Sequence, residues 1–425
     1  MKFLLRAYRE ITKRAYPLIE SRLRVKYGAG FEERCGIYGR EKTGVFGLRP
    51  TLWLHAVSVG EVQAAASVAS AAAASGWGGA VVVSTMTETG AAAVRDLMAG
   101  RYGAHIYAPW DVPDIAERAC SALQPSVFAA LETELWPNLL LELRSRKVPR
   151  LLINARVSDR RMRRARFMGG TLREMYGLFD GILARSGEDA RRLSSIGVDP
   201  DKIQVTGDTK IDSILERRSA ASRLLPDLAA YLSLGDEPVF VAGSTRSGEE
   251  KVILSAYAAA RNCPETSSAR LIIAPRHTER AKAVAETASG FGRTALFSSG
   301  PEEMKRADVV VIDTIGTLYS LYGLASSAFI GGSLVPKGGQ NILEPASWGV
   351  PTLHGPSMED FAEPTSALDS SGAAFPIANR SEIESLWRAA ARGELDVSPM
   401  CAKYFRDRSG ASASVWECLE RYLQR

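Results

Sequence analysis

The chain has few of the side chains that metal sites and disulfide frameworks require. Its 425 residues include only five cysteines and four histidines. No two histidines stand in an HxxxH or HExxH pair, which argues against a histidine-based metal site. The cysteines are odd in number and lack the close spacing of a zinc knuckle or a disulfide framework; they are Cys35, Cys120, Cys263, Cys401 and Cys418. We therefore expect no metal and a reducing, cytoplasmic compartment.

The chain also lacks a long apolar run and a strong surplus of charge. No apolar stretch approaches the roughly 20 residues of a membrane-spanning helix, and the alanine-rich stretch at 64–74 is too short. Lysine and arginine number 53 against 48 acidic residues, and no nucleic-acid recognition motif is present, so a nucleic-acid partner is not expected. Hydrophobic residues make up 46%, which excludes wholesale disorder, and the length predicts two or three domains.

The first 40 residues concentrate the positive charge, with ten lysines and arginines against four glutamates. Apolar side chains recur among them at helical spacing, from Leu4 and Leu5 to Leu18 and Ile19. This pattern is typical of a basic amphipathic helix, which either lies on an anionic membrane surface or packs on its own domain. The charges exclude a cleaved signal peptide, which needs an uninterrupted apolar stretch. We expect 1–40 to be a membrane-surface segment and retain the packed helix as the alternative.

From residue 51 onward, short apolar runs rich in β-branched residues alternate with helical patterns. A first series of strands is predicted at 52–57, 80–84, 127–131, 151–153, 181–184 and 203–206. A second series is predicted at 239–242, 271–274, 309–312, 328–331 and 352–354. Strands separated by helices imply parallel sheets with right-handed crossovers. The predicted fold is therefore α/β, with two Rossmann-like, doubly wound domains that face a central cleft.

The charged stretch at 215–236 marks the expected boundary between these domains. We predict domains at 41–220 and 221–425, and the last helix of the chain can pack back on the first domain. Ligands of open α/β sheets bind beyond the carboxyl ends of the strands. We therefore expect the catalytic and ligand-binding residues in the loops after the predicted strands.

In the first half these loops are rich in carboxylates and hydroxyls. They read HAVSVGE, ending at Glu61, then STMTETG, then ETELWPN, which contains Glu132 and Glu134. A glutamate such as Glu61 is either a general base or an acid merely favoured in the first turn of a helix. The next loop, NARVSD, runs into five arginines between Arg160 and Arg166, which suit an anionic partner or form a solvated helix face.

In the second half the loops are rich in small residues. They read GST after one strand, PRH after the next, DTIG after a third, and GGSL followed by GGQNILEP after a fourth. Small residues let backbone N–H groups approach phosphate, and a following acid can bind a ribose hydroxyl. The pattern predicts a nucleotide-like site. No GxGxxG or GxxxxGK[ST] fingerprint is present, which disfavours hydride transfer and P-loop chemistry.

The ordered motifs together resemble one family, the 3-deoxy-D-manno-octulosonic acid (Kdo) transferases of lipopolysaccharide synthesis. The resemblance runs from about Glu33 to Phe361 and is most specific in ETELWPN, NARVSD and PRHTER. It implies a GT-B glycosyltransferase with an acceptor-binding first domain and a CMP-sugar-binding second domain. Such an enzyme moves Kdo from CMP-Kdo onto a tetraacylated lipid A precursor (lipid IVA) at the cytoplasmic face of the bacterial inner membrane, without a metal or other cofactor.

The resemblance also assigns residues. Glu61 matches the family's general base, and Glu132 and Lys210 match the positions that stabilise the transition state, with Glu134 as the neighbour most easily confused with Glu132. The segments that match CMP contacts are Pro275, Arg276, Ile315, Gly316, Thr317, Asn341, Ile342, Leu343 and Glu344. From charge alone, Arg276 is expected to pair with the phosphate and Glu344 with the ribose.

Three departures from the family pattern affect these expectations. Gln340 stands where the family usually has His, and Ile315 and Thr317 replace Met and Glu. The usual amino-terminal membrane anchor is not found, which suggests surface attachment through the basic amino terminus, aided by the cluster from Arg160 to Arg166.

Two alternatives remain open at this stage. A GT-B-like sugar-nucleotide epimerase would share the cleft and need no lipid partner. A non-catalytic nucleotide-sugar-binding protein would share the fold, but it has no chemical reason to retain Glu61, Glu132 and Lys210 together.

Overall fold

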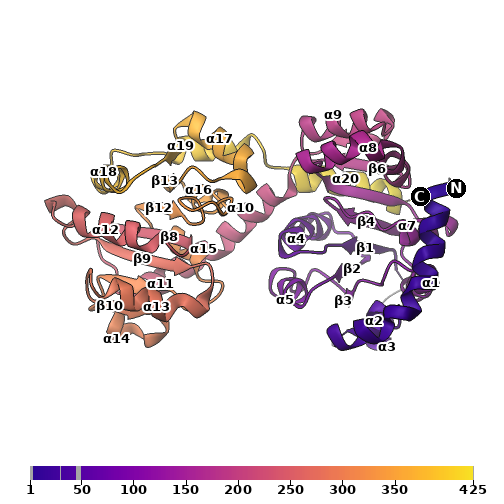
Figure 1. Cartoon of the computed structure of the whole chain (residues 1–425), viewed down its shortest axis with the longest axis horizontal. Helices are drawn as coiled ribbons and strands as arrows, with labels where there is room; N and C mark the ends of the chain where they lie inside the picture. Colours follow the sequence, from indigo (N-terminus) through magenta and orange to yellow (C-terminus); the bar gives the residue numbers. More distant parts are fainter. Residues whose placement is uncertain (1–2, 29, 45–48, 425) are drawn as a thin grey trace. The chain divides into compact units, whose positions relative to one another are not determined.

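The computed structural model describes residues 3–28, 30–44 and 49–424, and the chain forms two compact units (Figure 1). Unit 1 comprises Met1–Ser213 and Arg408–Arg425, and unit 2 comprises Ile214–Asp407. Helix α10 (Thr209–Ala221) begins in unit 1 and ends in unit 2. The boundary expected at 220/221 falls within this helix.

Unit 1 is built on a seven-stranded parallel sheet with the order β3-β2-β1-β4-β5-β6-β7. The strands are β1 (Thr51–His55), β2 (Ala80–Thr85), β3 (Ala104–Tyr107), β4 (Val127–Leu131), β5 (Arg150–Ala155), β6 (Gly181–Ala184) and β7 (Ile203–Val205). The central strands β1, β2, β4 and β5 are buried along their whole length, as expected for a parallel sheet covered on both faces.

The helices of unit 1 alternate with these strands. They are α1 (Phe3–Lys26), α2 (Phe31–Arg34), α3 (Arg40–Thr43), α4 (Val59–Ala74), α5 (Glu88–Leu97), α6 (Pro113–Leu123), α7 (Pro137–Ser145), α8 (Asp159–Tyr176), α9 (Gly187–Ile196) and α20 (Ala411–Leu423). The alanines of α4 allow close packing: Ala64, Ala65 and Ala69 lie in one buried cluster with strand residues of β1 and β4.

Helix α20 returns the end of the chain to unit 1. Trp416 is buried in the cluster that contains the α4 alanines, and its ring lies 5.2 Å from that of Trp77. The hydroxyls of Ser412 and Ser67 are 2.8 Å apart, and Asp212 accepts a hydrogen bond from Ser412 N at 2.6 Å. The carboxylate thus caps the start of α20 from the first turn of α10.

Unit 2 repeats the architecture with a second seven-stranded parallel sheet, in the order β10-β11-β9-β8-β12-β13-β14. Its strands are β8 (Val239–Thr245), β9 (Arg270–Pro275), β10 (Thr294–Leu296), β11 (Val309–Val311), β12 (Ser327–Ile330), β13 (Thr352–His354) and β14 (Ala374–Pro376). Its longer helices are α11 (Leu225–Leu232), α12 (Glu250–Ala260), α13 (Ala281–Ala288), α17 (Ala362–Ser371), α18 (Arg380–Ala391) and α19 (Ser398–Arg406). The short helices α14 (Pro301–Met304), α15 (Leu318–Tyr322) and α16 (Leu343–Ser347) complete it.

The predicted α/β class with two doubly wound parallel sheets is confirmed, and so is every strand predicted from the sequence, to within three residues at each end. Three strands were not predicted, namely β3, β10 and β14. Each lies at an outer edge of its sheet and is only partly buried. An edge strand has one neighbour and more solvent, so its sequence does not show a continuous apolar run.

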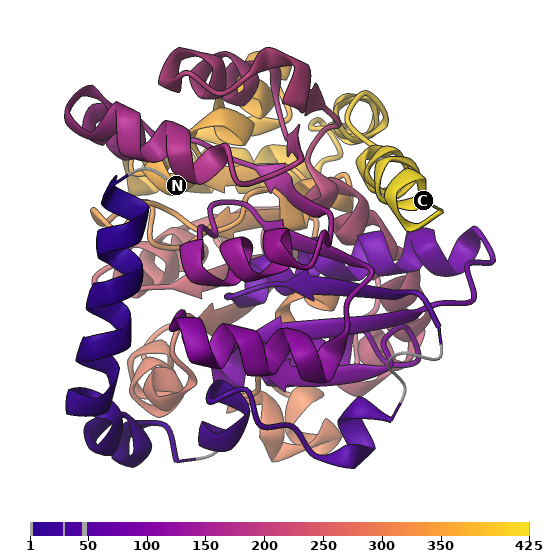
Figure 2. The same cartoon turned by 90° about the vertical axis from the view of Figure 1, so that its right-hand side faces the viewer.

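Helix α1 packs against unit 1 along one face and is exposed along another (Figure 2). On the packed face, Tyr8 Oη donates to Asp111 at 2.9 Å and Thr12 Oγ1 accepts from Asn138 Nδ2 at 2.9 Å. On the exposed face four apolar side chains follow one another at seven-residue intervals: Leu4 (52% exposed), Ile11 (64%), Leu18 (80%) and Val25 (88%). Among the described helices, none is both long enough and apolar enough to cross a bilayer.

Candidate functional site

In each sheet there is one pair of adjacent strands, the switch point, from which the chain continues toward opposite edges of the sheet. In unit 1 this switch point lies between β1 and β4, and in unit 2 it lies between β8 and β12. Open α/β sheets bind their ligands at such points, beyond the carboxyl ends of the strands. Glu61 lies in the first turn of the helix that follows β1, and Glu132 follows β4 directly. The sheet therefore brings these two carboxylates to one edge.

Glu61 lies in the first turn of α4 and is 7% exposed. Its Oε2 accepts from Val57 N at 2.6 Å, and its Oε1 accepts from Ser58 Oγ at 3.3 Å, while Ser58 caps the helix. Burial raises the pKa of Glu61 to about 8, helped by the negative charges of Glu132 and Glu134 and opposed by Lys210. The loop thus holds a buried and unusually basic carboxylate.

Glu132 and Lys210 form an ion pair beside Glu61. Glu132 has a left-handed backbone, with φ 55°, at the turn where β4 ends, and its amide donates to Ile153 O at 2.9 Å. The ammonium group of Lys210 also lies over Gly60, since a Cβ added there would be 3.5 Å from Nζ. One cation, Lys210, is therefore paired with Glu132 and lies next to the turn that carries Glu61.

The position of Lys210 is set by the start of α10. Lys210 N donates to Asp208 Oδ1 at 3.0 Å, and Thr209 N donates to Asn154 Oδ1 at 3.1 Å. Asn154, from NARVSD, is buried and has φ 52°, a conformation that Asn tolerates better than most residues. Asn154 and Asp208 therefore position Lys210, a role that the motifs alone do not reveal.

Glu134 has a different partner from Glu132. Its Oε2 accepts from Trp136 Nε1 at 2.9 Å. Burial raises the pKa of Glu134, and the hydrogen bond from Trp136 opposes this. Trp136 in turn packs edge-on against His55, whose ring centroid is 5.1 Å away, and burial lowers the pKa of His55 to about 3. Glu132, and not Glu134, is thus the carboxylate that pairs with Lys210.

The arginine cluster of α8 is divided between internal and exposed roles. Arg161 donates to Thr133 O at 3.2 Å and to Tyr176 Oη at 3.1 Å, which links the ETELWPN loop to α8. Arg160 and Arg163 are exposed. The side chains of Arg164 and Arg166 lie outside the described residues.

At the switch point of unit 2 the backbone at the end of β8 lies very close to the backbone that follows β12. Ser244 has φ 56°, and a Cβ on Gly331 would stand 2.2 Å from Ser244 O, so only glycine fits there. A Cβ on Gly243 would stand 1.8 Å from Tyr322 Oη. The loops after β8 and β12 are therefore packed backbone against backbone.

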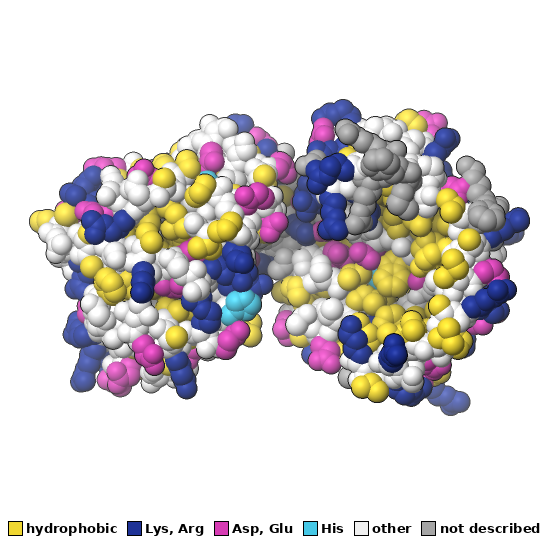
Figure 3. Space-filling model, in the orientation of Figure 1, with side chains coloured by type: hydrophobic (Ala, Val, Ile, Leu, Met, Phe, Trp, Pro, Cys, Tyr) yellow, Lys and Arg dark blue, Asp and Glu magenta, His cyan; other side chains and the backbone are white. Residues whose placement is uncertain are grey.

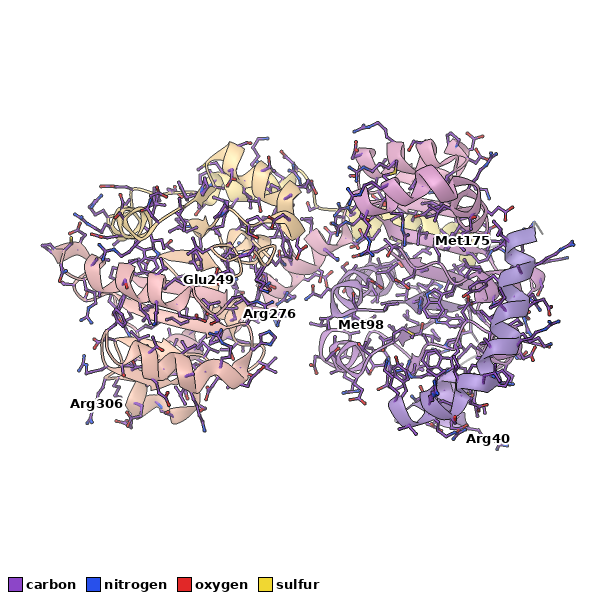
Figure 4. The ribbon with its side chains drawn as sticks, viewed as in Figure 1. Arg40, Met98, Met175, Glu249, Arg276 and Arg306 are labelled. Carbon is purple, nitrogen blue, oxygen red and sulfur yellow. The ribbon has the colours of Figure 1, made fainter. Side chains whose placement is uncertain are left out.

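Glu249 fastens these loops together. It is fully buried, and its two oxygens accept four backbone hydrogen bonds: from Arg246 N at 2.7 Å, Gly332 N at 2.8 Å, Leu334 N at 2.9 Å and Ser333 N at 3.0 Å. Figure 4 shows Glu249 and Arg276 in unit 2. Glu249 was not among the expected site residues, because a carboxylate that binds only backbone has no partner that a sequence motif could reveal.

The residues expected to contact CMP gather at the same edge of this sheet. Arg276 directly follows β9 and is exposed, Ile315 follows β11 and is 90% exposed, and Asn341 follows β12. Gly316 has φ 94°, and the Thr317 hydroxyl lies 3.0 Å from that of Thr314. The strands β11, β9, β8 and β12 are direct neighbours, so their parallel ends bring the three segments together. The side chains of Pro275, Ile342 and Leu343 are buried, so these residues can contact a ligand only through their backbone or support the residues that do.

Helix α16 begins just after Asn341, whose Oδ1 accepts from Leu343 N at 3.2 Å. Glu344 lies in the first turn of this helix and is bonded by Arg217 of α10 at 3.3 Å. Gln340 donates from Nε2 to Gly339 O at 2.9 Å. Across the described residues, no three His, Cys, Asp or Glu side chains converge in a way that could hold a metal ion.

Comparison with known proteins identifies relatives of this chain. Residues 29–213 match the family model described as 3-deoxy-D-manno-octulosonic-acid transferase (kdotransferase). The chain is 31% identical to the 3-deoxy-D-manno-octulosonic acid transferase of Haemophilus influenzae over 343 residues, which cover 80% of this chain and 77% of the relative. It is 30% identical to the enzyme of the same name from Bordetella pertussis, over 77% of this chain and 76% of the relative.

Among solved structures, UDP-GlcNAc 2-epimerase from Neisseria meningitidis superimposes with a TM-score of 0.60, over 88% of this chain and 99% of the epimerase. At 12% sequence identity this likeness shows the two-domain GT-B fold alone. The transferase relatives are far more similar in sequence and span most of both chains. The chain belongs to the 3-deoxy-D-manno-octulosonic acid transferase family of glycosyltransferases.

Proposed function

We propose that this protein transfers Kdo from CMP-Kdo to a hydroxyl of a tetraacylated lipid A precursor, with Glu61 as the general base. The observation that carries the proposal is the buried Glu61 carboxylate, whose pKa is raised to about 8, next to the Glu132–Lys210 pair. A base must be basic enough to take a hydroxyl proton as the hydroxyl attacks, and burial supplies that basicity.

In the proposed reaction the acceptor hydroxyl oxygen forms a bond to the anomeric carbon of Kdo as its proton passes to Glu61. The bond from that carbon to the phosphate oxygen breaks, and CMP departs with the electron pair. Positive charge develops on the sugar and negative charge on the phosphate. Glu132 would stabilise the sugar and Lys210 the leaving phosphate, so the pair would act on both charges.

Unit 2 would hold the donor. The exposed Arg276 would pair with the phosphate, and Glu344 would accept from the ribose. With a lysine at the leaving group, this reaction needs no metal, and we propose a metal-independent and cofactor-independent transfer.

The lipid acceptor implies a membrane surface, and the exposed face of α1 supports peripheral attachment at the anionic cytoplasmic face of the inner membrane. Hydrophobic side chains are present on the surface of unit 1 that Figure 3 shows. On α1 itself, Leu18 and Val25 are among the most exposed large apolar residues. In flotation with anionic liposomes, Leu18→Glu with Val25→Glu should reduce binding severalfold. Val205→Glu, at a site 52% exposed on β7, is the matched control and should not. Unchanged binding by the α1 variant would exclude this face.

The direct test mixes purified protein with CMP-Kdo and tetraacylated lipid A precursor and follows CMP release and product mass. The account predicts transfer by the wild type and none by Glu61→Ala, with CMP binding retained. A folded wild type that transfers nothing, or that epimerises a free sugar nucleotide instead, would contradict the proposal.

A further inference from the structure

The carboxylate expected to bind the donor ribose, Glu344, is itself held by another side chain. Arg217 Nη1 lies 3.3 Å from Glu344 Oε1, and both side chains are mostly buried, at 25% and 22% exposed. In the described part of unit 2, Oε2 of Glu344 accepts no hydrogen bond. One oxygen is thus anchored and the other is available to a ligand.

The guanidinium of Arg217 is itself fixed by an aromatic ring. Its Cζ lies 4.1 Å from the centroid of the Tyr319 ring, a cation–π contact. The Tyr319 hydroxyl donates to Ile214 O at 2.8 Å and lies 3.0 Å from Ser347 Oγ, which donates to Glu344 O at 2.7 Å. These contacts join α10, α15 and α16 into one small framework around the Glu344 side chain.

We infer that Arg217 is a positioning residue of the donor site. It holds Oε1 of Glu344, so that Oε2 accepts from the ribose hydroxyls of a cytidine nucleotide without first losing the freedom of a mobile glutamate. The inference depends on the proposed function, which places the donor in unit 2. Arg217 acts through Glu344 and does not touch the nucleotide.

A double-mutant cycle on CMP binding, measured by calorimetry, tests this directly. Arg217→Ala should weaken CMP binding about fivefold to tenfold, and Glu344→Gln at least as much. The double variant should bind no more weakly than Glu344→Gln alone, because Arg217 has no effect once its partner is gone. Arg223→Ala removes the same charge from an exposed site in the same unit and should leave CMP affinity unchanged.

Kinetics distinguish positioning from general loss of structure. Arg217→Ala should raise KM for the donor about as much as it weakens CMP binding, with kcat within about twofold of wild type. Arg217→Lys retains the charge but not the planar group over Tyr319, so it should restore affinity in part. Thermal unfolding shows whether each variant is folded. If Arg217→Ala does not fold, Arg217→Lys is used for the binding and kinetic measurements.

Three results would overturn the inference. CMP affinity unchanged in both Arg217 variants would show that the contact does not matter. Additive losses in the double variant would show that Arg217 affects CMP binding independently of Glu344. If the folded wild type binds no CMP, the proposed function fails and this inference fails with it.

Discussion

Each unit places a buried carboxylate shortly after the first strand of its sheet, and the two are held in opposite ways. Glu61 follows β1 and receives two hydrogen bonds, one from Val57 N and a longer one from the Ser58 hydroxyl. Glu249 follows β8 and receives four, all from backbone N–H groups of two loops. Similar topology thus supports two different uses of a buried charge.

The difference lies in how fully each charge is compensated. Glu61 is buried, has few hydrogen-bond donors and lies near two further carboxylates, so its ionised form is disfavoured and its pKa rises to about 8. The charge of Glu249 is distributed over four donors, which makes it a structural link between loops. A poorly compensated carboxylate is reactive, whereas a fully compensated one stabilises the fold.

The largest expected effect is on activity at Glu61. Glu61→Gln should lower kcat at least 1,000-fold, since the amide cannot accept the acceptor's proton. Because the pKa of Glu61 is raised from 4.5 to about 8, its ionisation destabilises the folded protein as pH rises through that interval. The variant should therefore be as stable as wild type or more stable at pH 8, by thermal unfolding.

The control for this variant is Glu88→Gln. Glu88 occupies the first turn of α5, the helix after β2, and is exposed. It should leave kcat and melting temperature unchanged. A Glu88 variant as inactive as the Glu61 variant would contradict a specific role for Glu61.

Substitution of Glu132 or of Lys210 should lower kcat about 100-fold. The two substitutions should shift the pH profile of kcat/KM in opposite directions. Glu132 raises the pKa of Glu61 and Lys210 lowers it. Glu132→Gln should therefore shift the rising limb of kcat/KM to lower pH, and Lys210→Met should shift it to higher pH. Shifts of both variants in the same direction would exclude this electrostatic coupling.

At Glu249 the expected effect is on stability. Glu249→Gln places an NH₂ group where backbone N–H groups require an acceptor, which should cost about 2–4 kcal/mol in the free energy of unfolding of unit 2. CMP binding should weaken with it, because the loops after β8 and β12 lose their tether. Chemical denaturation followed by a fluorescence probe in unit 2 measures the cost. A fully stable variant would contradict the contrast with Glu61.

The smallest effect compares two helix caps. Ser58 caps α4 with Glu61 bonded to the preceding amide, and Asn379 caps α18 with Glu382 bonded in the same way to Ala378 N. Ser58→Ala and Asn379→Ala should each cost about 1 kcal/mol in unfolding free energy. Only Ser58→Ala should lower kcat/KM, by about threefold to tenfold, because only its glutamate is buried at the site. Equal activities would mean that the Ser58 bond does not orient Glu61.

The sequence predicted the inner strands of both sheets and, of the four edge strands, only β7. Parallel strands such as β4 and β6 are continuous apolar runs between turns, and their predicted bounds match the structure. The edge strand β14 is only three residues long and ends in Pro376, so in the sequence it resembles a loop. A strand that is buried on both faces leaves a continuous apolar run in the sequence, whereas a short, partly exposed edge strand does not.

For the site, the sequence predicted which loops meet but not what each side chain does there. Glu61 follows a helix cap, as Glu382 does, and only the structure distinguishes the buried carboxylate from the exposed one. The Lys210–Glu132 pair joins residues far apart in the chain, and so does the contact of Arg217 with Glu344. Such contacts depend on the sheet order, which a single sequence does not reveal.

The pH dependence of kcat/KM for Kdo transfer shows whether Glu61 is the base, because it reports the ionisation of the free enzyme's base. For wild type the account predicts a rate that rises about tenfold per pH unit and levels off near pH 8, the pKa of Glu61. The residual activity of Glu61→Gln should lack this limb. A wild-type rate that is already level below pH 6, or a limb that survives in Glu61→Gln, would contradict Glu61 as the base.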